Sequence, residues 1–158
     1  MKHTIAIVFA VLSVVLYVCG IHFQRTDVFA EQSMFLYQFC QVNIWHLLGN
    51  MSALYSIESS SFKASWKTWL LAYLVSALIP CESPTEGMSG LLYAVMGIIS
   101  WQAANTKVFH MWCAVFIGVC FLFPNAVNGW LHVWCYLAGV MIGLADVIWK
   151  MERGRCKK

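Results

Sequence analysis

The sequence predicts an all-α fold, a polytopic membrane bundle of six transmembrane helices that forms a single domain over residues 1–158. Of its 158 residues, 61% are hydrophobic and 11% are charged, whereas soluble globular domains are about 45–50% apolar and about 25% charged. Apolar runs recur along the chain and are separated by short segments that carry Pro, Asn, Ser or charged residues. The net charge is only +3 and no basic run has interleaved aromatic residues, so nucleic acid is not an expected partner.

The first apolar run is predicted to be a transmembrane helix rather than a signal peptide. It covers residues 5–23. This is long for the apolar region of a signal peptide, and no Ala-x-Ala-like cleavage site follows it. Residues 24–41 are then expected to form a loop, whose aromatic side chains suit the membrane–water interface: Phe35, Tyr37 and Phe39.

Five further apolar runs complete the set of spans. They are expected at residues 42–57, 66–79, 87–104, 108–123 and 130–149. Pro80 and Pro124 close the third and fifth spans, because proline cannot continue a helix. The start of the fourth span stays open, since Ser83–Glu86 has the pattern of a capping box that would begin the helix before Gly87. Several spans are shorter than the ~20 residues that cross a bilayer comfortably, so packing, local thinning or tilt must accommodate them.

The positive charges predict the orientation in the membrane. Six spans place both termini on one side. Nine of the ten Lys and Arg residues fall on that side and Arg25 falls on the other; the nine are Lys2, Lys63, Lys67, Lys107, Lys150, Arg153, Arg155, Lys157 and Lys158. By the positive-inside rule, both termini are cytoplasmic.

Four polar side chains converge within the expected bundle. Ser89 lies near the outer end of the fourth span, and His132 lies one turn below the outer end of the sixth. His46 and Asn50, spaced i, i+4, share a face of the second span. These three spans all run inwards, so the four side chains are expected at similar depth. Polar residues inside a membrane usually face a cavity and carry a function.

Each of these residues also has a purely structural interpretation. A lone serine can bond to its own helix, and a lone His or Asn can link two helices. The glycines beside Ser89, Gly87 and Gly90, can serve helix packing alone, and Gly139 and Gly143 form a GxxxG pattern that we interpret as a close helix contact. The convergence of four polar side chains nevertheless favours a shared site.

The converging residues suit acyl transfer. A serine hydroxyl needs an adjacent base to become a nucleophile, and His132 is the expected general base for Ser89. The side-chain N–H groups of His46 and Asn50, together with the backbone N–H of Ser89, can stabilise an oxyanion. A position near a helix N-terminus adds the positive end of the helix dipole. Asp146 lies about 20 Å further along the sixth span, so we expect a Ser–His dyad without a carboxylate.

Other chemistries lack their motifs. Leu91 replaces the last glycine of a G-x-S-x-G elbow, and no H-E-x-x-H zinc motif is present. The seven cysteines form no CxxC pair. We therefore expect no metal and no cofactor. Cys40 and Cys81 both fall outside the membrane, and whether they pair stays open. Tyr93, one turn below Ser89, is expected to pack against the His132 ring.

Three blocks of the sequence resemble the rhomboid family of intramembrane serine proteases. Residues 87–97, GMSGLLYAVMG, resemble the motif of its fourth span. His46–Asn50 resembles the His-x-x-x-Asn of its second span, and Asn128–His132, followed by glycines, resembles the segment around its base in the sixth. The blocks cover residues 42–143, in the right order and on the right spans.

The resemblance implies a serine endopeptidase that cleaves peptide bonds in transmembrane segments through an acyl-enzyme intermediate. It implies Ser89 as nucleophile, His132 as general base, His46 and Asn50 as oxyanion donors, and Tyr93 stacked on the base. The expected substrates are single-span membrane proteins within the lipid bilayer. The chain resembles a minimal six-span bacterial type without a preceding domain, which implies the bacterial cytoplasmic (inner) membrane. Because the four polar residues lie near the outer face, we expect the site to open to that side.

The chain departs from the family pattern at Leu131 and Cys135, where the family has a small residue and a glycine. Its first outer loop is also short and lacks the family's Trp–Arg pair. Two other functions stay open. A catalytically silent relative acting as a membrane chaperone or adaptor would not react with a serine-directed fluorophosphonate. A b-type cytochrome with His46 and His132 as axial haem ligands would show a Soret band.

Overall fold

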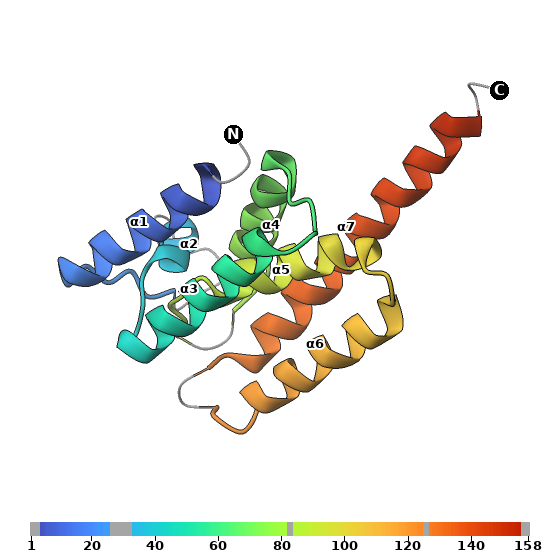
Figure 1. The fold of residues 1–158 in the computed structure, drawn as a ribbon. Coiled ribbons are helices and arrows are strands. Elements are labelled where there is room, and N and C mark those ends of the chain that lie inside the picture. The colour runs from blue at the N-terminus through green and yellow to red at the C-terminus, as the bar shows by residue number, and fades with distance from the viewer. Residues whose placement is uncertain (1–3, 26–32, 82–83, 125–126, 156–158) are drawn as a thin grey trace.

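The fold is all-α, as predicted, over the part of the chain that the structure describes. The computed structural model describes residues 4–25, 33–81, 84–124 and 127–155. Within these ranges it has the helices α1 (Thr4–Val18), α2 (Ser33–Leu36), α3 (Ile44–Ser59), α4 (Trp66–Leu78), α5 (Ser89–Ile99), α6 (Thr106–Cys120) and α7 (Gly129–Arg155). Short 3-10 turns follow α2 and α5, at Tyr37–Phe39 and Ser100–Gln102. Figure 1 shows α5 in the middle of the bundle and α7 extending beyond it.

Four of the long helices begin at a residue whose side chain caps them. Asn43, Ser65, Asn105 and Asn128 each accept a hydrogen bond from the backbone N–H three residues further on, at the starts of α3, α4, α6 and α7. Such a cap satisfies one of the N–H groups that a helix start leaves free. Because α3 and α7 carry His46 and His132 in or just after their first turns, these caps also fix the height of the two histidines.

Several predicted helix boundaries are wrong by a few residues. The first helix ends at Val18 rather than near residue 23. Gly20 adopts a φ of +64°, and the N–H of Ile21 bonds back to the carbonyl of Leu16 at 2.9 Å, which is a glycine-terminated helix end. At the C-terminal end of the chain, α7 continues to Arg155, six residues beyond its predicted end at 149.

The central helix α5 begins at Ser89, two residues later than predicted, and the possible earlier start is wrong. Thr85 pairs instead with Arg25 in an isolated antiparallel bridge; Ser83, the predicted cap, lies outside the described residues. Gly87 has a φ of +121°, a conformation that residues with a Cβ rarely adopt. The chain therefore turns sharply at Gly87 and enters α5 with Ser89 as its first helical residue.

The core of the fold surrounds α5. Its apolar side chains are almost completely buried, including Leu91, Leu92 and Val95, and it packs most extensively against α7. The two helices approach closely at glycines: a Cβ on Gly97 would overlap the carbonyl oxygen of Tyr136, and one on Gly139 would overlap the carbonyl oxygen of Ala94. The interpretation of Gly139 and Gly143 as a close helix contact is confirmed, since a Cβ on Gly143 would lie 2.5 Å from the Ile98 oxygen.

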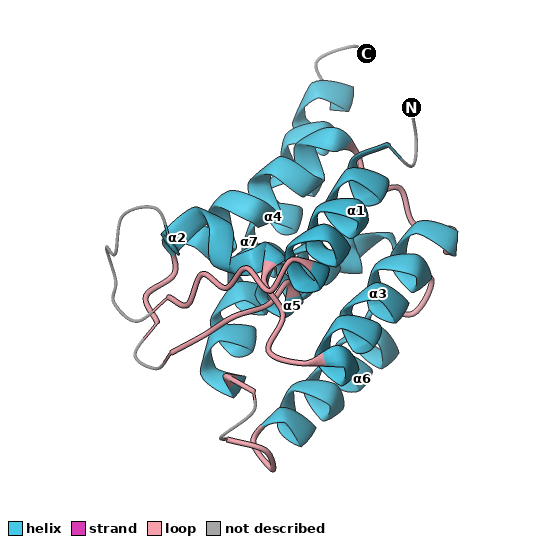
Figure 2. Ribbon diagram, turned by 90° about the vertical axis from the view of Figure 1, so that its left-hand side faces the viewer, coloured by secondary structure: helices cyan, strands magenta, loops and turns pink. Residues whose placement is uncertain are grey.

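Two of the three aromatic side chains predicted at the membrane–water interface are instead buried in the protein, whereas Phe35 is 37% exposed. Tyr37 is fully buried and Phe39 is 5% exposed. The Tyr37 hydroxyl donates to the backbone oxygen of Ser76 at 2.7 Å, and the fully buried Arg25 guanidinium donates to the same oxygen at 3.2 Å. Arg25 also lies over the Tyr37 ring. The segment before α3 therefore packs onto α4 as part of the core, and Figure 2 shows the loops crossing the bundle there.

The outside of the bundle carries many large apolar side chains. On α6 these include Met111, Trp112 and Phe116, each more than half exposed, and α1 exposes Ile7 and Val11 to a similar degree. Among the described residues one helix, Gly129–Gly154 with a mean hydropathy of 1.7, is long and apolar enough to cross a membrane, while α1 and α6 are apolar but shorter.

Candidate active site

Ser89 and His132 form a hydrogen-bonded pair between the two central helices. The Nε2 atom of His132 lies 2.7 Å from the Ser89 hydroxyl oxygen. Ser89 is the first residue of α5, and His132 lies in the first turn of α7. His132 is 2% exposed. The close α5–α7 contact at Gly97 and Gly139, two turns further along each helix, holds these two first turns together.

Tyr93 covers one face of the His132 ring. The two ring centroids lie 4.6 Å apart, with an angle of 32° between the ring planes. Tyr93 is one turn after Ser89 on α5, so the same helix supplies both the Ser89 hydroxyl and the ring that restrains His132. The predicted packing of Tyr93 on His132 is therefore found.

His46 lies against the glycine that turns the chain into α5. A Cβ on Gly87 would overlap the His46 ring, with its Nε2 atom 2.9 Å away, so only glycine fits here on steric grounds as well as by its φ. Within the described part of the chain, the buried Nδ1 atom of His46 has no hydrogen-bond partner. The ring thus reaches the start of α5 with a nitrogen that no described residue engages in a hydrogen bond.

Asn50 is buried one turn further along α3, at 5% exposure. Its side-chain nitrogen donates to Oε1 of Gln41 at 2.7 Å. An amide nitrogen carries two hydrogens, so this bond orients the amide and leaves one N–H of Asn50 for another acceptor.

Two cavities meet at these side chains. An apolar cavity of about 500 Å³ runs between α3, α5 and α6 and is lined by His46, Asn50, Ser89, Tyr93 and His132 among others. A second cavity of about 360 Å³ is more polar and also reaches His46, Ser89 and His132; loop residues such as Gln24 and Glu86 line it. The structure therefore brings all four predicted polar residues to one cavity and gives three of them a second, polar approach.

Two carboxylates are paired with other residues, Glu86 at this end of the bundle and Asp146 near the far end of α7. Glu86 lies 3.1 Å from the His22 ring nitrogen, and Asp146 is paired with Lys150. The hydrogen-bond partners of His132 among the described residues are Ser89 and Cys120, and neither is a carboxylate. Nor do three or more His, Cys, Asp or Glu side chains gather there as a metal site in the described ranges.

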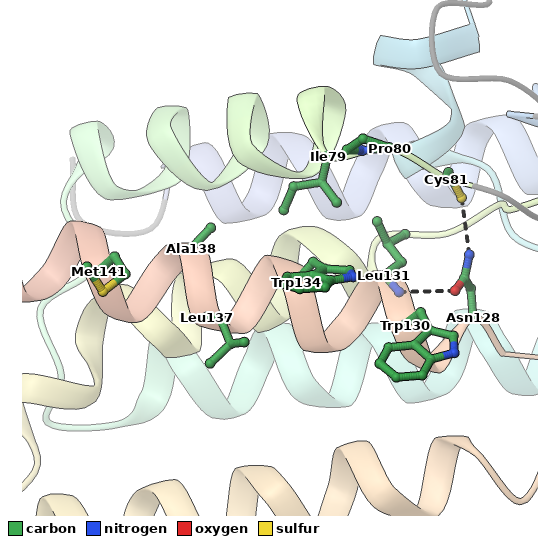
Figure 3. A pocket seen from close by; sticks show the side chains of 10 residues that line it. All are labelled: Ile79, Pro80, Cys81, Asn128, Trp130, Leu131, Trp134, Leu137, Ala138 and Met141. Carbon is green, nitrogen blue, oxygen red and sulfur yellow. Dashed lines mark hydrogen bonds between the residues drawn. The ribbon is translucent and has the colours of Figure 1, made fainter.

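Asn128 organises the start of α7, a role that was not predicted from the sequence. Its Oδ1 accepts from the backbone N–H of Leu131 at 3.0 Å, and its Nδ2 lies 3.1 Å from Cys81 Sγ and 2.9 Å from Thr85 Oγ1. Figure 3 shows Asn128 between the start of α7 and the loop that leads to Ser89. It thereby ties the helix of His132 to the segment before Ser89. An Asn just before an apolar run is a recognised helix-start signal.

Two further residues at the site gave no signal in the sequence. Gln41 lies in an irregular segment, so no periodicity predicts its contact with Asn50. Cys120 ends α6, and its Sγ lies 3.4 Å from Nδ1 of His132. Among apolar residues on a helix, a cysteine is indistinguishable from a packing residue until the neighbouring helix is placed.

A third cavity, of about 970 Å³ and so larger than the two at the site, lies between α4 and α7 and is lined by neither Ser89 nor His132 (Figure 3). Cys81 lies at one end of it. Cys40 and Cys81 are both free thiols, so the open question of their pairing is answered against a disulfide. Burial raises the pKa of the Cys40 thiol.

The chain was compared with models of protein families and with curated proteins. No family model matches it, and no curated protein matches it.

Proposed function

We propose that the chain is an intramembrane serine endopeptidase of the rhomboid type, which cleaves peptide bonds in the transmembrane segments of single-span membrane proteins. The observation that carries the proposal is the 2.7 Å contact between Ser89 Oγ and His132 Nε2. It joins a hydroxyl at a helix start to a buried imidazole, which is the arrangement that activates a serine nucleophile.

The proposed reaction uses the two residues as a dyad. The Ser89 hydroxyl proton passes to Nε2 of His132 as Oγ attacks the peptide carbonyl carbon. His132 then gives this proton to the leaving nitrogen, the C–N bond breaks, and an acyl-enzyme remains on Ser89. Water attacks the ester, its proton passes to His132 and then to Oγ, and the acid product leaves.

The oxyanion of each tetrahedral intermediate needs donors around Ser89. The proposed donors are the backbone N–H of Ser89 at the positive end of α5, the His46 ring and the free N–H of Asn50. Their support is that His46 and Asn50 line the same cavity as Ser89, and that Gln41 fixes the orientation of the Asn50 amide.

The membrane setting is part of the proposal. We propose six spans, corresponding to α1 and α3–α7, with both termini cytoplasmic and the site open to the outer side of a bacterial inner membrane. The exposed apolar side chains of α1 and α6 support burial in lipid, because soluble monomers rarely expose large contiguous apolar patches. The more polar cavity supports a route for water from the end where α3, α5 and α7 begin.

The test uses the purified full chain in detergent and in liposomes. We expect labelling by a fluorophosphonate and cleavage of at least one member of a panel of single-span substrates. Ser89→Ala and His132→Ala should abolish both. Ser100→Ala is the matched control, because the Ser100 hydroxyl is buried on the same segment but donates only to its own helix, at the Gly97 oxygen. Failure of the folded wild-type protein to label or cleave, or persistence of either in Ser89→Ala, would overturn the proposal.

A further inference from the structure

The second nitrogen of the His132 ring has its own partner, and that partner is a thiol. Nε2 of His132 faces Ser89, whereas Nδ1 on the opposite edge of the ring lies 3.4 Å from Sγ of Cys120. This distance is within the range of a hydrogen bond to sulfur. In the described part of the chain, Cys120 Sγ is the hydrogen-bond partner of His132 Nδ1.

The direction of this hydrogen bond follows from the other contact of the thiol. Cys120 Sγ lies 3.3 Å from the backbone oxygen of Phe116, one turn earlier on α6, and donates its proton to that oxygen. A thiol has one proton and a sulfur that accepts weakly. With its proton directed to Phe116, the sulfur accepts the Nδ1–H of His132.

A neutral imidazole carries one N–H, so a proton on Nδ1 leaves the lone pair on Nε2. Nε2 is the atom that faces the Ser89 hydroxyl. The tautomer that Cys120 favours is therefore the one in which His132 can take the proton of Ser89. The opposite tautomer would direct an N–H at the serine oxygen and could not act as a base.

The packing around Cys120 keeps this geometry in place. Phe121, the next residue, packs edge-to-face on Trp130 with 5.3 Å between the ring centroids, which joins the end of α6 to the first turn of α7. The Tyr93 hydroxyl also lies 3.8 Å from Cys120 Sγ. His132 is thus held on one face by the Tyr93 ring and on one edge by Cys120.

We infer that Cys120 is the positioning residue of the dyad: its sulfur accepts the Nδ1–H of His132 and so holds the imidazole in the tautomer and orientation that serve Ser89. The inference rests on the proposed function. It assigns to a thiol the place beside the base that a carboxylate occupies in a Ser–His–Asp triad. A neutral sulfur is a weak acceptor, so its contribution is smaller than that of a carboxylate.

The kinetic test compares two substitutions of Cys120 with one control. Cys120→Ala should lower kcat and the rate of fluorophosphonate labelling about three- to tenfold, since one weak neutral hydrogen bond is lost, and should leave KM unchanged. Cys120→Ser restores an acceptor and should recover most of the rate. Cys113→Ala is the matched control, because it removes a buried thiol from the same helix that packs with Ile117 and Tyr136 and has no hydrogen bond to His132; it should keep the wild-type kcat. Equal rates for wild type and Cys120→Ala, or a Cys120→Ser variant as slow as Cys120→Ala, would overturn the inference.

A second measurement needs no variant of Cys120. The ¹⁵N chemical shifts of the His132 ring in the wild-type protein, identified by their loss in His132→Gln, report which nitrogen carries the proton. A protonated Nδ1 supports the inference and a protonated Nε2 overturns it. The two proposals fail separately: an unreactive wild type or a reactive Ser89→Ala overturns the protease, whereas an active protease indifferent to Cys120 overturns only the positioning role.

Discussion

Gly97→Ala should destabilise the fold and slow the reaction, although it adds a single methyl group far from Ser89. The new Cβ would overlap the Tyr136 carbonyl oxygen and lie 2.8 Å from the Val140 backbone nitrogen. Both atoms belong to the backbone of α7, so no side chain can rotate away and the two helices must separate.

The magnitude follows from two opposing effects. Replacing Gly by Ala in a helix gains about 1 kcal/mol from helix propensity. Overpacking costs typically about 1–3 kcal/mol, occasionally more, and a backbone clash belongs at the upper end. We expect a net loss of about 2 kcal/mol in the free energy of unfolding, which lowers the melting temperature by about 4–8 °C for a chain of this size. Because Gly97 lies two turns from Ser89, the separation should also lengthen the contact with His132 and reduce labelling.

The assay is thermal unfolding of the purified protein in detergent, with two controls that carry the same substitution. Gly118→Ala meets no atom within 4 Å, so it should match or exceed the wild-type melting temperature. Gly90→Ala meets side-chain atoms rather than backbone, at 3.3 Å from Leu131 Cδ2 and 3.4 Å from both Leu131 Cγ and Cys135 Sγ, and should change stability by less than about 1 kcal/mol. If Gly97→Ala has the same melting temperature as Gly118→Ala, the close approach of α5 and α7 is refuted.

Three further predictions concern the proposed oxyanion donor Asn50, the buried Arg25 and the orientation of the chain in the membrane. Asn50→Ala should lower kcat by about 10²–10³, the effect of losing one oxyanion donor, and should lower it less than His132→Ala does. If both variants fold and both lose all activity, Asn50 has a structural role instead. Arg25→Ala should lower the free energy of unfolding by about 2–3 kcal/mol, because packing on Tyr37 and one charge-assisted hydrogen bond to Ser76 are lost; an unchanged melting temperature would contradict the role of Arg25 in the core. In a cysteine-free background, a membrane-impermeant thiol reagent should label Pro84→Cys from the outer side and Lys107→Cys from the cytoplasmic side, whereas the reverse pattern would invert the proposed topology.

The proximity of Ser89 and His132 could be predicted from the sequence because it depends on how far each residue lies from the end of the bundle. Both residues begin apolar runs that run in the same direction, and helix starts at one end of a bundle lie at similar height. His46 and Asn50 follow from the i, i+4 spacing in the same way. The all-α class follows from the apolar composition together with the length of the apolar runs.

Contacts made by irregular segments could not be predicted in this way. Arg25 entered the sequence analysis only as a charge to be counted on one side of a membrane, and its burial depends on how residues 20–25 pair with the loop before α5. The contact of Gln41 with Asn50 likewise depends on a segment without periodicity. The early end of the first helix could have been predicted, since Gly20 is a common signal for a helix end.

The start of α5 differs from the starts of α3, α4, α6 and α7 in one respect: Met88, at its capping position, is in a helical conformation and provides no side-chain hydrogen bond. A capping side chain stabilises a protein by about 1 kcal/mol, and α5 does without it. A capping side chain at position 88 would accept the backbone N–H of Leu91, three residues further on, as the caps of the other helices do. It would leave the N–H of Ser89, the proposed oxyanion donor, unoccupied. The start of α5 is therefore a place where the fold can gain stability without losing the backbone donor that the proposed reaction needs.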